Sequence, residues 1–332
     1  MKSAYLCGVL IIGIVLALVA ACLLGSTPIG ATRVIAAILG QAAPGDTIVI
    51  WEIRLPRALA ALVVGAALGI SGAALQGLLR NPLAEPGVLG VTASAALAAT
   101  FTLYYGLAAG SALILPAASI VGALGATALL ALAAMRIGSV VTLILLGVGL
   151  SSFSAALMSL LLNLAPNPFS LSDMINWLLG SVANRSYDDL KISTPFIAAG
   201  MFILFVTRRG LSALTLGEEA ASGIGLDLRR QRLAVVLGAG LATGAAVALA
   251  GAIGFVGIVA PHIVRPFVGY DPARSLVPSA LLAGLILVLA DIGVRLLPTN
   301  TELKLGVVAA LIGAPAFIWI AVQRRTINGQ AG

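Results

Sequence analysis

Few residues of this chain could carry out covalent chemistry, and their spacing does not suit it. The 332-residue sequence contains a single histidine, His262, so an H-E-x-x-H motif or a histidine-based metal cluster is excluded. Lysines stand only at positions 2, 191 and 304, and none completes a P-loop, so the chain cannot bind ATP in that way. No G-x-S-x-G nucleophile elbow occurs. We therefore expect a non-enzyme with no catalytic residue, no metal site and no cofactor.

The two cysteines also exclude a disulfide framework. Cys7 and Cys22 belong to one apolar stretch, 4–24, where a helix would place them about 22 Å apart. This stretch is long for the apolar part of a signal peptide, and many similar stretches follow it. We read it as a retained first membrane helix.

Composition places the chain in a membrane. Hydrophobic residues make up 60% of the sequence and charged residues 9%, and the mean hydropathy is +1.12. A soluble domain carries about a quarter charged residues. The apolar stretches lack the alternation of a β-barrel strand. The net charge of +7 does not indicate a nucleic-acid partner here, because no basic run is interleaved with aromatic residues.

Apolar stretches between charged or Pro/Gly-rich segments predict an all-α polytopic membrane protein with about ten transmembrane helices, in one permease domain covering residues 1–332. The boundary between the seventh and eighth helices is a weak break around Gly251 and Gly254 rather than a polar loop. The expected spans are 4–24, 58–79, 88–106, 111–134, 140–163, 192–207, 233–252, 254–268, 275–296 and 306–323.

The distribution of Lys and Arg predicts that both termini are cytoplasmic. The inside set has 12 members: Lys2, Arg80, Arg136, Arg208, Arg209, Arg229, Arg230, Arg232, Arg265, Arg274, Arg324 and Arg325. The outside set has 7: Arg33, Arg54, Arg57, Arg185, Lys191, Arg295 and Lys304. A faint internal echo also predicts an inverted repeat of two four-helix units. In it, Arg57, Gly65 and Gly69 correspond to Arg232, Gly240 and Gly244.

Six segments in a fixed order carry a resemblance that covers residues from about 50 to 322. They are Arg54-Leu55-Pro56-Arg57, Arg80-Asn81-Pro82-Leu83-Ala84-Glu85-Pro86-Gly87, Trp177-Leu178-Leu179-Gly180-Ser181, Leu216-Gly217-Glu218-Glu219-Ala220-Ala221, Gly251-Ala252-Ile253-Gly254-Phe255 with Pro261-His262, and Leu305-Gly306-Val307-Val308 with Gly313-Ala314-Pro315. The chain resembles the FecCD-type permeases of binding-protein-dependent ABC importers, which take up iron–siderophore complexes, haem and cobalamin. Lys304 departs from the pattern, which has a small residue or proline before Leu305-Gly306.

The resemblance implies a permease dimer, expected here as a homodimer, in the inner membrane. It also implies a cytoplasmic ABC ATPase dimer and a periplasmic or lipid-anchored substrate-binding protein as partners. The substrate would be a bulky metal chelate, an iron–siderophore complex in the first place, with haem or cobalamin as alternatives. An ion-coupled secondary transporter is the rival reading, but the helix interiors contain few of the carboxylates that it would use.

The resemblance further implies that the outward arginines Arg54, Arg57 and Arg295 pair with glutamates of the binding protein, since a guanidinium can hold a carboxylate with two hydrogen bonds. Two other roles stay open. These arginines could anchor helix ends at the interface, and Asp291, four residues before Arg295, could neutralise it internally.

The segment 210–230 is expected to couple the permease to the ATPase. It has the pattern of a short amphipathic helix between two membrane spans, and the resemblance implies that it fits a cleft on the ATPase. The expected coupling residues are Leu214, Leu216, Gly217, Glu218, Glu219, Ala220, Ala221 and Gly225.

Six more residues are structural or pathway candidates. Asn81 and Pro82 are expected to end a helix, and Gln76 and Asn163 to form hydrogen bonds between helices. Pro261 and His262 are expected at a cytoplasmic helix end, where His262 caps or packs rather than binding a ligand.

Overall fold

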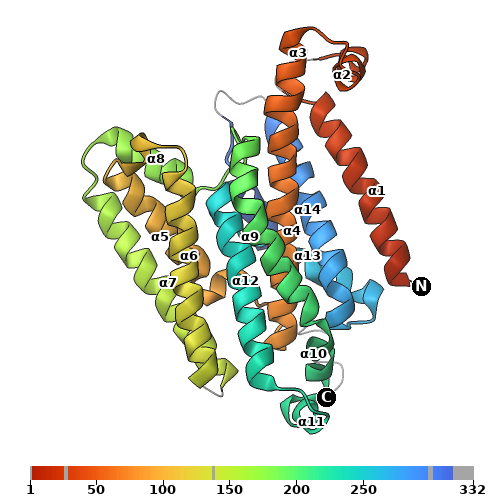
Figure 1. Cartoon of the computed structure of the whole chain (residues 1–332), viewed down its shortest axis with the longest axis vertical. Helices are drawn as coiled ribbons and strands as arrows, with labels where there is room; N and C mark the ends of the chain where they lie inside the picture. Colours follow the sequence, from red (N-terminus) through yellow and green to blue (C-terminus); the bar gives the residue numbers. More distant parts are fainter. Residues whose placement is uncertain (1, 26–28, 137–138, 298–301, 317–332) are drawn as a thin grey trace.

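The computed structural model describes residues 2–25, 29–136, 139–297 and 302–316, and within them every regular element is helical (Figure 1). In this described part of the chain, seven helices are long and apolar enough to span a membrane, and three shorter apolar helices accompany them. The predicted all-helical membrane fold is confirmed. The long helices are α1 (Lys2–Leu23), α4 (Leu55–Leu78), α6 (Ile114–Arg136), α7 (Val140–Asn163), α9 (Tyr187–Val206), α12 (Leu228–Ala250) and α14 (Pro272–Leu296). The shorter ones are α5 (Val91–Tyr104), α13 (Val256–Val264) and Leu305–Ala316.

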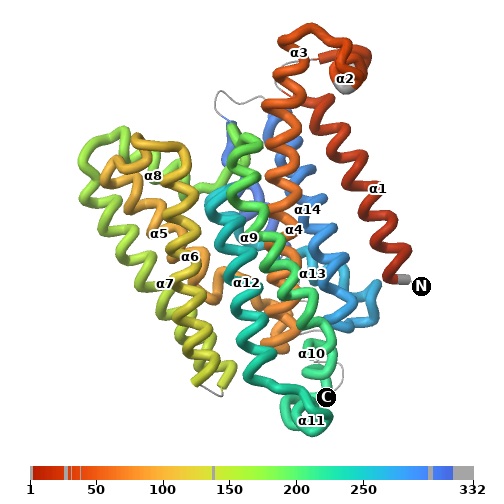
Figure 2. Tube along the Cα trace, in the orientation of Figure 1, coloured from red at the N-terminus to blue at the C-terminus, as the bar shows by residue number. Residues whose placement is uncertain are grey.

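The helices form three groups that run side by side (Figures 1 and 2). α4, α9 and α12 lie in the centre, α1, α13 and α14 lie on one side, and α5, α6 and α7 lie on the other. Short helices mark the two ends of the bundle. α2 (Ala31–Ile38), α3 (Pro44–Ile48) and α8 (Pro168–Leu178) lie at one end, and α10 (Arg208–Ala213) and α11 (Glu218–Gly223) lie at the other.

Two of these elements differ from the sequence prediction. The second predicted span, 58–79, is only the apolar part of a helical run that continues from Pro44 to Leu78, because the polar residues before it remain helical outside the apolar region. α8 was not predicted. It begins where the Asn167 side chain accepts a hydrogen bond from the backbone N–H of Ser170 at 2.8 Å, with Pro168 in its first turn.

Glycines let two pairs of helices approach closely. A Cβ atom on Gly65 or Gly69 of α4 would lie 2.4 or 2.3 Å from a backbone oxygen of α14. On α12, a Cβ atom on Gly240 or Gly244 would lie 2.2 Å from a side chain of α6. The glycines of the proposed repeat therefore serve the same purpose in both halves, and α4 with α14 corresponds to α12 with α6, the pairing that an inverted repeat would produce.

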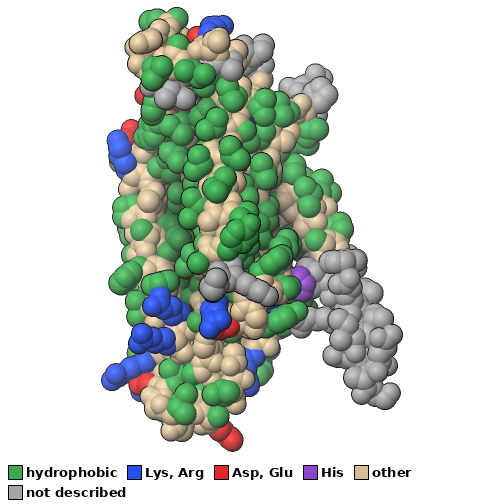
Figure 3. Space-filling model, turned by 90° about the vertical axis from the view of Figure 1, so that its right-hand side faces the viewer, with side chains coloured by type: hydrophobic (Ala, Val, Ile, Leu, Met, Phe, Trp, Pro, Cys, Tyr) green, Lys and Arg blue, Asp and Glu red, His purple; other side chains and the backbone are tan. Residues whose placement is uncertain are grey.

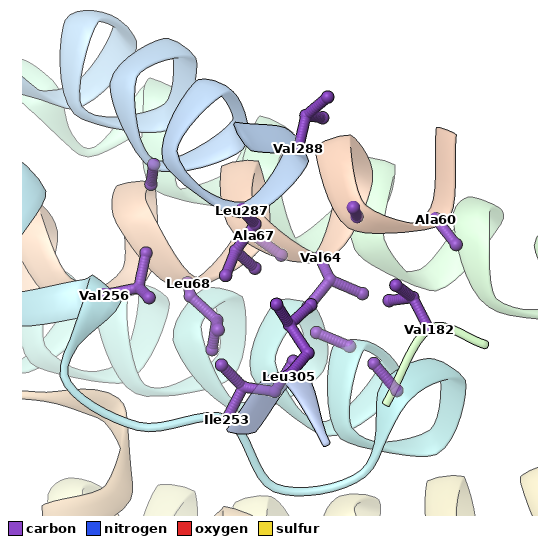
Figure 4. Close-up of a cluster of buried hydrophobic side chains, with 14 of the residues drawn as sticks. Ala60, Val64, Ala67, Leu68, Val182, Ile253, Val256, Leu287, Val288 and Leu305 are labelled. Atoms are coloured by element: carbon purple, nitrogen blue, oxygen red, sulfur yellow. The ribbon is translucent and has the colours of Figure 1, made fainter. Parts of the chain in front are cut away.

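Small and aliphatic side chains fill the centre of the molecule. The cluster in Figure 4 joins Val64 and Leu68 of α4 to Leu287 of α14, Ile253 and Leu305. The outer surface is also apolar. On the face over α1, hydrophobic side chains cover the middle, and Lys and Arg gather below them at the end that carries α10 and α11 (Figure 3).

The break between α12 and α13 is complete, where the sequence indicated only a weak interruption. Residues 251–255 are not helical, and Gly251 and Phe255 both have positive φ, 72° and 67°. A side chain on Gly251 would lie 2.4 Å from the carbonyl oxygen of Trp177, so the loop needs glycine there for space as well as for its dihedral angle. α13 therefore begins at Val256, two residues after the start of the predicted 254–268 span, and a 3-10 turn, Arg265–Val268, continues it to the predicted end.

Candidate functional sites at the two ends of the bundle

The segment around α11 has a buried side and an exposed side. Leu214 and Ala221 are 2% and 0% exposed and belong to the hydrophobic core. Leu216 and Ile224 are each 67% exposed. The predicted amphipathic helix is divided in the structure: α10 continues as a 3-10 turn, Leu214–Leu216, and Gly217, with φ of 98°, separates this turn from α11, which ends before Gly225, with φ of 93°. The result is a compact projection anchored by its apolar side.

The two glutamates of this segment differ in their surroundings. Glu218 forms an ion pair with Arg232 of α12, with 2.8 Å between Oε2 and Nη2. Glu219 and Ala220 are exposed. Of the two carboxylates, Glu219 is the one free to face a partner, while Glu218 ties α11 to the bundle.

Gln76 joins three segments near the same end. Its Nε2 donates to the carbonyl oxygens of Ala84 and Gly257 at 3.1 and 3.3 Å, and its Oε1 accepts from Arg265 at 2.5 Å. The predicted hydrogen bonding between helices is therefore present at Gln76. Arg80, Pro82 and Arg265 line an adjoining cavity of about 310 Å³.

The other structural candidates occupy local positions. The Asn81 side chain is exposed and accepts from the backbone N–H of Leu83 at 3.0 Å, in a turn after the end of α4. Asn163 is exposed and donates to Ser159 of its own helix at 2.9 Å, instead of bonding to another helix. Pro261 is buried inside α13, and His262 lies in the last turn of that helix.

At the opposite end, Arg57 and Arg295 share a buried carboxylate. Asp291, 1% exposed, accepts hydrogen bonds from Nε and Nη2 of Arg57 at 2.9 and 2.7 Å. Nε of Arg295 lies 3.2 Å from Asp291. Arg57 also pairs with Glu302, just before the last described helix. The sequence indicated the Asp291–Arg295 contact, but nothing in it indicated Glu302 as a partner.

Arg54 and Arg295 also hold the end of α1. Arg54 Nη1 donates to the carbonyl oxygens of Cys22 and Leu23 at 2.7 and 3.0 Å, and Arg295 Nη1 donates to Ala21 at 3.1 Å. These carbonyls lie in the last turn of the helix, where no amide of the helix itself is available. All three predicted docking arginines therefore have internal contacts in this structure.

Comparison with known proteins identifies the family of this chain. The FecCD transport family matches residues 10–323. The chain belongs to this family. One relative is BtuC, a vitamin B12 import system permease protein of Vibrio cholerae, which is 41% identical over 82% of each chain. Another is YfiZ of Bacillus subtilis, a probable siderophore transport system permease protein, at 35% identity over 83% of each chain.

The solved structures agree. The fold superimposes with a TM-score of 0.86 on an inward-facing conformation of a metal-chelate type ABC transporter, at 31% identity, over 96% of this chain and 99% of that one. This FecCD protein is thus the permease subunit of an ABC importer for metal chelates, whose family works with an ATPase and a substrate-binding protein. Membership excludes the rival reading of an ion-coupled secondary transporter.

Proposed function

We propose that two copies of this chain form a homodimeric permease of the inner membrane that imports an iron–siderophore chelate, with the α10–α11 end in the cytoplasm and the α8 end outside. The observation that carries the orientation is the projection around α11. Its exposed Leu216 and Ile224 stand on the buried Leu214 and Ala221, which suits a surface that an ATPase grips and moves. The excess of Lys and Arg assigned to that side supports the same orientation.

Labelling with membrane-impermeant maleimide tests the orientation. Cys7 and Cys22 are first replaced, and cysteine is then introduced at Asp188 or at Ser222, both of which are exposed. In intact spheroplasts we expect Asp188→Cys to react and Ser222→Cys to react only after the membrane is opened. The reverse pattern would contradict the proposed direction of transport.

The roles proposed for the arginines follow from their contacts. Arg54, Arg57 and Arg295 hold the outer ends of α1, α4 and α14 together. We propose that each arginine contacts the binding protein only when a carboxylate of that protein replaces one of the arginine's internal hydrogen-bond acceptors. The relatives include cobalamin and siderophore permeases. A siderophore is favoured for this chain by the two cations, Arg185 and Lys304, that line a cavity at the α8 end.

A further inference from the structure

A second polar cavity lies at the α8 end and contains two of the predicted outward cations. Its volume is about 310 Å³, and residues from α5, α6, α8, the 181–185 loop, the end of α12 and the segment just before the last described helix line it. Arg185 and Lys304 contribute the positive charges, Trp177 and Asn176 of the α8 region contribute an indole and an amide, and Asp173 is the acidic group of the lining.

The cations of this cavity are not held in ion pairs by the described residues. No ion pair joins Arg185 or Lys304 to a described carboxylate, and Nε of Arg185 is buried without a hydrogen-bond partner in the described chain. Asp189 acts on Arg185 electrostatically, but its Oδ2 already accepts from the N–H and the hydroxyl of Ser186, both at 2.9 Å.

Other predicted outward cations form ion pairs with carboxylates of the same chain. Arg33 pairs with Asp46, Lys191 with Asp188, and Arg57 and Arg295 with Asp291. Burial lowers the pKa of Arg185, and Asp189 opposes that shift, yet a guanidinium stays charged at neutral pH. A partly buried charge that forms no ion pair is costly, so the site is suited to an incoming anion.

The backbone beneath the cavity is fixed by three close contacts. The N–H of Gly306 donates to the carbonyl of Gly180 at 3.0 Å, and the N–H of Ser181 donates to Ala250 at 2.7 Å. A Cβ atom on Gly306 would lie 2.3 Å from the carbonyl oxygen of Leu179. Lys304 and Arg185 therefore project from segments that are locked to each other, and the cavity is organised before a ligand arrives.

We propose that this cavity binds an anionic oxygen group, a carboxylate or catecholate, of the chelate that the permease carries. The proposal rests on the importer function proposed above and narrows its substrate to a negatively charged chelate. Arg185 and Lys304 supply charge-assisted hydrogen bonds, and Trp177 supplies an aromatic wall for a planar ligand arm. With Asp173 the lining carries a net charge of +1, so an uncharged chelate gains little from it.

Trp177 provides a direct readout. The chain has three tryptophans, so replacing Trp51 and Trp319 by phenylalanine leaves Trp177 as the reporter in the full-length permease in lipid vesicles. The probes are gallium(III) citrate, which is anionic, and the gallium(III) complex of a neutral trihydroxamate. With the citrate complex we expect a saturable fluorescence change. With the hydroxamate complex we expect no fluorescence change that depends on Lys304.

Variants connect this response to the two cations. Lys304→Gln and Arg185→Gln should each weaken citrate binding about tenfold, as expected for the loss of one charge-assisted hydrogen bond, and Lys304→Arg should retain it. Lys191→Gln is the matched control, because Lys191 is an outer lysine that does not line the cavity. Equal affinity in the wild type, Lys304→Gln and Arg185→Gln proteins would overturn the proposal.

A carboxylate could also come from the substrate-binding protein. Its affinity for the assembled transporter is therefore measured with the same variants. If Lys304→Gln weakens docking and leaves citrate binding unchanged, the cavity serves the binding protein and the proposal is wrong. ATP-driven chelate uptake is a separate readout. If ATP-driven uptake is absent while the Lys304-dependent fluorescence change remains, the importer function alone is overturned, because the fluorescence reports binding without transport.

Discussion

Asp291→Asn should destabilise the α8 end of the bundle more than any exposed charge change. Asparagine keeps the shape of the side chain but removes the negative charge that lies between Arg57 and Arg295. Both arginine side chains are nearly buried, with exposed fractions of 10% and 7%. Water therefore cannot solvate the two guanidinium groups in place of the lost carboxylate. Glu302 would then be the remaining described carboxylate beside Arg57.

The size of the effect follows from this burial. Breaking a buried ion pair by removing one partner costs about 3–5 kcal/mol, which corresponds to roughly a 10²–10⁴-fold change in the unfolding equilibrium. At about 2–4 °C per kcal/mol for a large domain, the midpoint of thermal unfolding should fall by on the order of 10 °C. Asp188→Asn is the matched control. It removes the partner of Lys191 in an ion pair whose side chains are 78% and 75% exposed, and exposed pairs contribute little.

The assay is thermal unfolding of the purified permease in detergent, followed by tryptophan fluorescence and by the fraction that stays monodisperse. Basal folding is checked first by helical circular dichroism at low temperature. If Asp291→Asn and Asp188→Asn unfold at the same midpoint, the buried cluster does not hold the helices together, and our interpretation of Arg57 and Arg295 is incorrect.

Three further outcomes are expected. Leu216→Arg with Ile224→Arg should leave the fold intact, since both side chains are 67% exposed, but should abolish transport-coupled ATP hydrolysis in the assembled complex; wild-type coupling would place the ATPase contact elsewhere. Glu218→Lys, which breaks the pair with Arg232, should lower the unfolding temperature as well as coupling, so a purely functional defect would contradict the contact. Gly72→Val should prevent correct packing, because a Cβ atom there would lie 1.9 Å from the carbonyl oxygen of Gly257, whereas Gly8→Val, with nothing within 4 Å, should elute normally in size-exclusion chromatography.

The sequence predicted the class and most spans because the requirement for long apolar helices in lipid leaves few alternatives. It missed α8 because that helix is short and mixed in composition, although Asn167 and Pro168 at its start are a recognisable helix-beginning signal. The contact between Gln76 and Arg265 spans 189 residues, and no local pattern carries such information. Only the general expectation of a hydrogen bond between helices was within reach for Gln76.

The arginines show a different limit of sequence reasoning. Their number on the predicted outer side required an explanation, and the family resemblance implied docking. Whether a side chain faces solvent or a buried carboxylate depends on packing between segments far apart in the chain, such as Arg57 and Asp291, which are 234 residues apart. The four-residue spacing of Asp291 and Arg295 was local, and that contact could be anticipated.

The shortness of α13 has a consequence for how the protein enters the membrane. Together with the 3-10 turn Arg265–Val268 that continues it, α13 extends about 20 Å, less than the roughly 30 Å hydrocarbon core, so we expect this segment to insert poorly as an independent span. α13 packs directly against α14 and α4, and α14 is synthesised immediately after it. We therefore expect α13 to enter the membrane together with α14, as a helical hairpin.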